Sequence, residues 1–114
     1  MDKRKDKRLN AKLHVKVKSG TVTSWGILTD VSENGLFIKS NRDLAVDTVI
    51  NIEIVMPDNS TSLLKGIVKR RIELSEEYRK YGLGIELTEK DFRFINLVVS
   101  LLDYSGMKTV KILG

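Results

Sequence analysis

The segment VINIEIVMPDNS (residues 49–60) determines the fold class more than any other part of the sequence. Its three isoleucines stand at alternate positions, which is the period of a β-strand with one buried face. Pro, Asp, Asn and Ser then follow, and tight turns favour these residues, so residues 62–74 are predicted to return as the second strand of a hairpin. Gly66, in the middle of that second strand, predicts a bulge or a bend.

Four other segments have the alternation or the β-rich composition of short strands. They are residues 13–17, 21–30, 35–40 and 82–87. Together with the hairpin they give five or six strands separated by frequent turns. This pattern predicts a mainly β fold, a small antiparallel barrel.

The pattern changes to a helical period near the C-terminus. Residues 88–91 (Thr-Glu-Lys-Asp) fit a capping box. The apolar residues that follow at helical spacing are Phe92, Ile95, Val98, Val99 and Leu102. We expect a C-terminal helix over about residues 89–104, ended by Gly106, with its apolar stripe over one end or edge of the barrel. The tail at residues 108–113 is a candidate for a last short strand.

Composition limits the function classes. The chain has 114 residues, 41% of them apolar and 31% charged, which is typical of one globular domain. It has no cysteine and a single histidine, His14, which is predicted to be exposed on a strand. Disulfides, thiolate metal sites and two-histidine mechanisms are thereby excluded, and the scattered acidic residues form no acid–base pair. We predict no enzyme, no catalytic residues, no metal and no cofactor.

Charge and hydropathy bear on location and partners. No apolar run approaches the ~20 residues that cross a bilayer, and the N-terminus is charged where a signal peptide would turn apolar. We therefore expect a cytoplasmic protein without membrane insertion. The formal net charge of +5 indicates an anionic partner.

The first eight residues, MDKRKDKR, hold five basic residues and two acidic ones. Arg4 and Arg8 lie on the same side of either a helix or an extended segment, so both can address one ligand. Arginine binds phosphate in a bidentate manner, stacks on purine rings and pairs with the O6/N7 edge of guanine. We expect a flexible basic arm at residues 1–10, followed by a barrel domain at residues 11–114. By composition alone, a solvated arm without a ligand is the simpler interpretation.

The segment DVSENG (residues 30–35) lies between two predicted strands. Asp30 can accept two hydrogen bonds from the N1–H and N2–H₂ edge of guanine, and Ser32 adds a small donor and acceptor. Gly35 allows a close approach of the backbone or a positive φ. Taken alone, the preferred interpretation is that both side chains bind the backbone of their own turn. Together with the arginine pair, the turn forms a complementary set for a guanine nucleotide with phosphates.

These two motifs resemble the signature of PilZ domains, the bacterial receptors for cyclic di-GMP. The signature is RxxxR in an N-terminal arm and [D/N]xSxxG some twenty or more residues later. Here RKDKR (4–8) and DVSENG (30–35) match both parts, with twenty-one residues between them. GLFIKS (35–40) and YGLGIELTEKD (81–91) resemble the strand after the turn and the late strand before a terminal helix. The resemblance therefore covers nearly the whole chain.

The resemblance implies a six-stranded antiparallel barrel with a flanking helix. It also implies that the arginines contact the phosphates and bases of cyclic di-GMP, and that the turn lines the base-binding side. The residues implied are Arg4, Arg8, Asp30, Ser32 and Gly35. Secondary candidates are Lys3, Lys5, Asn34 and Gly84. The family often has a proline soon after the second arginine, where Asn10 stands here, so we expect a change in the stiffness of the arm.

The resemblance further implies how the protein signals. Cyclic di-GMP would order the arm against the barrel, and the altered surface would act on an unidentified protein partner. The resting state is expected to be a monomer or a weak dimer. Two alternatives stay open: a PilZ-like adaptor that binds no nucleotide and, ranked below it, a small nucleic-acid-binding barrel.

Overall fold

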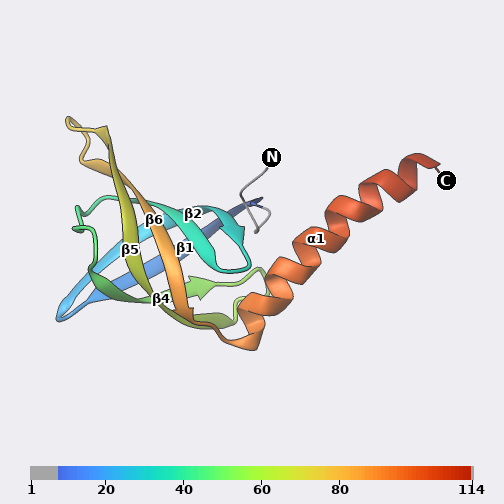
Figure 1. Ribbon diagram of the computed structural model, residues 1–114, viewed down its shortest axis with the longest axis horizontal. Helices are drawn as coiled ribbons and strands as arrows, with labels where there is room; N and C mark the ends of the chain where they lie inside the picture. Colours follow the sequence, from blue (N-terminus) through green and yellow to red (C-terminus); the bar gives the residue numbers. More distant parts are fainter. Residues whose placement is uncertain (1–7, 114) are drawn as a thin grey trace.

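The computed structural model describes the backbone of residues 8–113 and the side chains of residues 8–103. Within these residues, six strands close into an antiparallel barrel and one C-terminal helix leaves it (Figure 1). The elements are β1 (Leu9–Ser19), β2 (Val22–Ser32), β3 (Gly35–Ser40), β4 (Val49–Val55), β5 (Thr61–Ser75), β6 (Lys80–Glu89) and α1 (Phe92–Leu113). The predicted mainly β, six-stranded antiparallel barrel with a C-terminal helix is confirmed. β1 begins two residues inside the segment predicted as the arm.

The order of strands around the barrel is β1-β2-β3-β6-β5-β4, closed by the pairing of β1 with β4. The alternating residues of β4 that predicted a buried face, Ile50, Ile52 and Ile54, are at most 1% exposed and belong to the core of the barrel. Burial of such apolar faces from all six strands is what holds the barrel together.

The β4–β5 hairpin and its bulge are confirmed. The backbone N–H of Met56 donates to the carbonyl of Ser60, and Asn59 takes a positive φ of 71° in the turn. The pairing of β5 with β6 shifts register between Lys65 and Gly66. A Cβ at Gly66 would lie 2.7 Å from the carbonyl oxygen of Glu86, so a side chain does not fit at this position.

The predicted limits of the helix are wrong at both ends. β6 continues to Glu89, which pairs with Lys65, so residues 88 and 89 belong to the sheet. Asp91, rather than Thr88, is the N-cap, and its Oδ1 accepts a hydrogen bond from the backbone N–H of Phe94 at 3.0 Å. α1 then continues past Gly106, because one glycine costs a helix only about 1 kcal/mol and no proline or turn motif follows it. The predicted last strand at residues 108–113 is therefore helix.

The face of α1 that packs on the barrel also differs from the predicted stripe. Phe94 and Val98 are buried, and Leu97 and Leu101 pack against the same core. Of the predicted stripe, only Val98 is buried. Asp91 also accepts hydrogen bonds from β5, so it fixes where the helix begins relative to the barrel. No helix in the part of the chain that the structure describes is long and apolar enough to span a bilayer.

Candidate functional site

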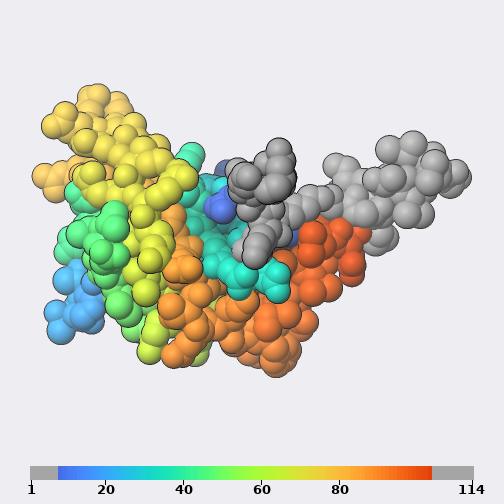
Figure 2. Space-filling view, viewed as in Figure 1, coloured from blue at the N-terminus to red at the C-terminus, as the bar shows by residue number. Residues whose placement is uncertain are grey.

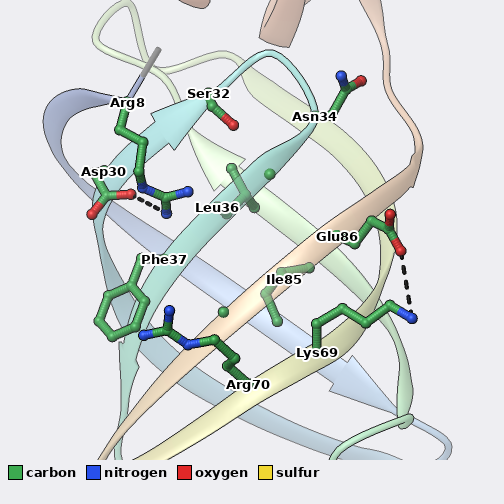
Figure 3. A pocket seen from close by; sticks show the side chains of 12 residues that line it. Arg8, Asp30, Ser32, Asn34, Leu36, Phe37, Lys69, Arg70, Ile85 and Glu86 are labelled. Atoms are coloured by element: carbon green, nitrogen blue, oxygen red, sulfur yellow. Dashed lines mark hydrogen bonds and ion pairs between the residues drawn. The ribbon is translucent and has the colours of Figure 1, made fainter. Parts of the chain in front are cut away.

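A cleft of about 580 Å³ lies on the outer surface of the barrel, between the β2–β3 turn and strands β5 and β6 (Figure 3). Of the predicted site residues, the following line this cleft: Arg8, Asp30, Ser32, Gly35, Asn34 and Gly84. The other predicted site residues, Lys3, Arg4 and Lys5, lie outside the described residues. The cleft thus brings together residues that are far apart in the sequence.

The β2–β3 turn positions its two polar residues by strand register. Ser32 pairs with Gly35 and Asp30 pairs with Phe37, after a register shift between Leu28 and Asp30. Side chains two apart in a strand lie on the same face, so Asp30 and Ser32 both line the cleft. Ser32 is buried, whereas Asp30 is partly exposed.

The missing side chain of Gly35 allows the β2–β3 turn to lie close to β6. Its φ is not positive, and a Cβ there would lie 3.0 Å from the carbonyl oxygen of Ile85 on β6. The tip of the turn is also held by Lys90, which directly follows β6. The ammonium of Lys90 donates at 2.9 Å to the carbonyl of Glu33 and to Oδ1 of Asn34. Because it is held by both β6 and Lys90, the turn is a preformed wall of the cleft.

Arg8 and Asp30 form an ion pair at one side of the cleft. Arg8 Nη2 donates to Asp30 Oδ1 at 2.5 Å, and both side chains remain partly open to solvent (Figure 3). Surface ion pairs of this kind contribute about 0–1 kcal/mol to stability, so the pair is of more interest for binding than for folding. The two motifs that the sequence analysis singled out therefore meet directly, through one residue from each.

The lining residues that the sequence analysis did not select include Phe37, Lys69 and Arg70. Neighbouring residues of a regular strand face opposite sides, but β5 shifts register between Val68 and Arg70, so Lys69 and Arg70 both reach the cleft. Nothing in the sequence signals this shift, because the only glycine of β5 is at the earlier bulge.

The two glycines of β6 make room for these side chains. A Cβ at Gly82 would collide with the ring of Phe37, and a Cβ at Gly84 would lie 3.3 Å from Cβ of Arg70. Both glycines thus allow a close approach to β6. As a result, the ring of Phe37 and the guanidinium of Arg70 lie over β6, below Asp30 in the view of Figure 3.

The charges of the cleft suit an anionic ligand with hydrogen-bond donors. Arg8, Lys69 and Arg70 supply positive charge, and the carboxylates of Asp30 and Glu86 supply acceptors. Lys69 and Glu86 lie 3.6 Å apart in an exposed pair, which is screened by solvent. Among the described residues, no cluster of three or more His, Cys, Asp or Glu side chains is arranged to hold a metal ion.

Comparison with known proteins places this cleft in context. The family model described as PilZ domain matches residues 2–103. No curated protein matches the chain by sequence. Three similar solved structures are described below, and at their low sequence identity the likeness shows the fold alone.

The first is the PilZ domain with c-di-GMP of YcgR from Escherichia coli, with 14% identity and a TM-score of 0.70, covering 96% of this chain and 99% of that one. The second is the MrkH–c-di-GMP complex from K. pneumonia, with 15% identity and a TM-score of 0.73, covering 95% of this chain and 55% of that one. The third is the inhibitor of motility MotI/DgrA from Bacillus subtilis, with 15% identity and a TM-score of 0.71, covering 97% of this chain and 53% of that one. The chain spans about half the length of the last two.

Proposed function

Because the chain belongs to the PilZ domain family, we propose that it is a receptor for cyclic di-GMP, which binds in the cleft beside the β2–β3 turn. PilZ domains are receptor or adaptor domains and not enzymes, and two of the similar structures contain c-di-GMP. The observation that carries the proposal is the meeting of Arg8 and Asp30 in a cleft that also contains Ser32 and Gly35.

The proposed binding mode assigns each described residue a chemical role. Asp30 accepts hydrogen bonds from the N1–H and N2–H₂ groups of one guanine, and Gly35 lets the base approach the backbone. Asp30 keeps one oxygen outside its contact with Arg8, and a guanidinium has five N–H donors. The N–H groups of Arg8 that do not contact Asp30 can therefore donate to a phosphate or to the O6/N7 edge of guanine.

Phe37 and Arg70 add a stacking surface and another cation. The half-buried ring of Phe37 and the planar guanidinium of Arg70 lie where a purine bound by Asp30 can stack on them. Arg4, the first arginine of the signature, is proposed to hold a phosphate. Its place lies outside the described residues.

Signalling is proposed to run through residues 1–8. Their five cations repel one another, and the two phosphates of the ligand would offset part of this positive charge and fold the segment over the cleft. An altered surface at the mouth of the cleft would then act on a protein partner. Hydrogen exchange measured with and without cyclic di-GMP tests this: protection of residues 3–10 is expected on binding, and unchanged exchange at saturating ligand contradicts it.

Isothermal titration of cyclic di-GMP tests the receptor proposal. Asp30→Ala and Arg8→Ala should each weaken binding by about tenfold to a hundredfold, as expected for lost hydrogen bonds to charged groups. Glu73→Ala and Arg42→Ala are matched controls, because they remove the same charges from exposed positions outside the cleft. Cyclic GMP, which has one base and one phosphate, should bind far more weakly.

The same variants separate the alternatives. A folded protein that gives no heat with cyclic di-GMP would be an adaptor. A nucleic-acid-binding barrel would bind oligonucleotides more tightly as they lengthen, with a steep salt dependence, and Asp30→Ala would strengthen that binding. Opposite signs of the effect at Asp30 therefore distinguish a guanine pocket from a general polyanion surface.

A further inference from the structure

Over residues 92–103, whose side chains the structure describes, helix α1 has apolar side chains on two sides, and the barrel covers only one of them. The side of Phe94 and Val98 is buried in the core. The other side carries a row of four exposed apolar residues, which we name the seam. The seam consists of Phe92 (66% exposed), Ile95 (46%), Val99 (48%) and Leu102 (41%).

The positions of polar and apolar residues around the helix show that the seam belongs to a continuous apolar surface. At about 100° per residue, the polar residues of 92–103 fall within roughly 80° of the helix circumference. These polar residues are Arg93, Asn96, Ser100 and Asp103. A helix that packs on one neighbour normally shows an apolar stripe somewhat over 100° wide, with polar residues on the rest of its surface. α1 has an apolar arc of roughly 200°, enough for two neighbours.

The spacing of the seam indicates the kind of neighbour. Its residues are three, four and three positions apart, from Phe92 to Leu102. This is the alternation of the a and d positions of a coiled coil, in which one helix packs side chains between those of another. The seam itself contains no charged residue, so charge gives it no preference for an acidic or a basic partner. A helix with the same spacing is the complementary surface, and a second copy of the chain provides one.

The position of α1 leaves the seam open to a second copy. In Figure 1 the helix extends away from the barrel, and its contacts to the strands are with β1 and β5. Figure 2 shows α1 (orange to red) at the end of the molecule opposite the β5–β6 hairpin (yellow). The sequence of the first seven residues, MDKRKDK, contains Met1 as its one apolar residue and is therefore a poor match to an apolar surface.

The exposed area of the seam sets the strength of the association. Its four side chains leave roughly 350 Å² of apolar surface uncovered per copy, within the range of the largest patch on a typical monomer. Pairing two seams removes about 700 Å², and flanking side chains bring the total toward the lower limit of specific interfaces, about 1,200 Å². An interface of that size corresponds to a dissociation constant in the micromolar range rather than to an obligate dimer.

We propose that α1 is a dimerisation helix, whose seam packs against the seam of a second copy about a two-fold axis. Such an interface is isologous, so each residue that faces the seam acts twice. A substitution that puts a charge in the seam therefore buries two charges in the dimer, one from each copy. The association needs no nucleotide, and the seam lies apart from the residues that line the cleft.

Sedimentation velocity over a concentration series without nucleotide tests the proposal. The wild type is expected to pass from monomer to dimer between roughly 1 and 500 µM. Val99→Lys places a charge in the middle of the seam and should raise the dissociation constant at least tenfold. Ser100→Lys is the matched control: it adds the same side chain one position away, on the polar face, and should leave the dissociation constant unchanged.

Cross-linking gives a second measurement that does not depend on a charge. Because the chain contains no native cysteine, Val99→Cys introduces a single thiol at the seam, and Ser100→Cys introduces one on the polar face. A short bis-maleimide should join Val99→Cys into dimers and leave Ser100→Cys as monomer.

Three results would overturn the proposal. A wild type that stays monomeric at about 500 µM, or a Val99→Lys variant that dimerises as the wild type does, excludes the seam as a self-association surface. A monomeric wild type whose binding to another protein is lost in Val99→Lys assigns the seam to a different partner. Circular dichroism shows whether Val99→Lys is folded, and titration of cyclic di-GMP into the wild type keeps failure of this proposal distinct from failure of the receptor proposal.

Discussion

Asp91 joins α1 to the barrel, and its replacement should therefore destabilise the whole domain. Its Oδ1 caps the helix at the backbone N–H of Phe94 and accepts a hydrogen bond from the Ser62 hydroxyl at 2.7 Å. Its Oδ2 accepts a hydrogen bond from the backbone N–H of Leu63 at 2.8 Å. One carboxylate thus fixes both the start of the helix and its attachment to β5, and Asp91→Ala removes all three bonds.

The structure allows the size of the effect to be worked out. Loss of a helix N-cap costs about 1 kcal/mol. Ser62 is fully buried, and a buried hydroxyl left without its acceptor costs about 1–3 kcal/mol. The N–H of Leu63 is exposed enough to bind water instead, so its loss adds little. The free energy of unfolding should fall by about 3 kcal/mol, a large part of the 5–15 kcal/mol of a typical domain.

Urea denaturation, followed by circular dichroism, measures this change. A loss of about 3 kcal/mol lowers the midpoint by roughly 1.5–2 M urea for a domain of this size. Asp91→Asn should lose about half as much, because its Oδ1 can still accept from Phe94 and Ser62 while its amide meets the N–H of Leu63. Ser62→Ala in the Asp91→Ala background should cost little more, since the two residues share one interaction. A loss below about 0.5 kcal/mol for Asp91→Ala would refute the reasoning.

Three shorter predictions concern other parts of the molecule. Burial raises the pKa of Asp91, but hydrogen bonds from the Ser62 hydroxyl and two backbone N–H groups outweigh it and hold that pKa below its ordinary value. The resulting stability is present above about pH 4 and lost as the pH falls through the folded-state pKa, so unfolding measured between about pH 5 and 3 should depend less on pH in Asp91→Asn. Arg70→Ala should weaken cyclic di-GMP binding about tenfold in calorimetry with an unchanged melting temperature, and equal affinity would remove Arg70 from the site. Gly66→Val should lower the free energy of unfolding by about 2 kcal/mol in urea denaturation because its Cβ meets a backbone carbonyl, and an unchanged midpoint would contradict this.

The strands could be predicted from the sequence because each carries its own evidence. The three buried isoleucines of β4 alternate within eight residues, and the Pro-Asp-Asn-Ser turn follows directly. The start of the helix could not be predicted in this way. The sequence offers both Thr88 and Asp91 as caps, and the choice depends on β5, which pairs with β6 up to Glu89 and presents Ser62 to Asp91.

Some residues of the candidate site could likewise be predicted from local sequence, and others could not. Asp30, Ser32 and Gly35 lie within one turn, so their shared face follows from local spacing. Arg70 could not be selected, because its direction depends on a register shift against β6 that no residue of β5 signals. The apolar spacing of α1 was visible in the sequence, but the spacing alone does not say which side of a nearly all-apolar arc the barrel covers. The packing of Phe94 decides that, and leaves the predicted stripe exposed.

Lys90 connects the proposed nucleotide cleft with the proposed seam, and its contacts limit how strongly the two can influence each other. Its ammonium binds Glu33 and Asn34 in the wall of the cleft, and it directly precedes the N-cap of α1. Hydrogen bonds of a partly exposed lysine contribute about 1 kcal/mol or less. A ligand that breaks or strengthens them can therefore change the dimer dissociation constant by no more than about fivefold through Lys90, and dimerisation can change ligand affinity only by the same factor.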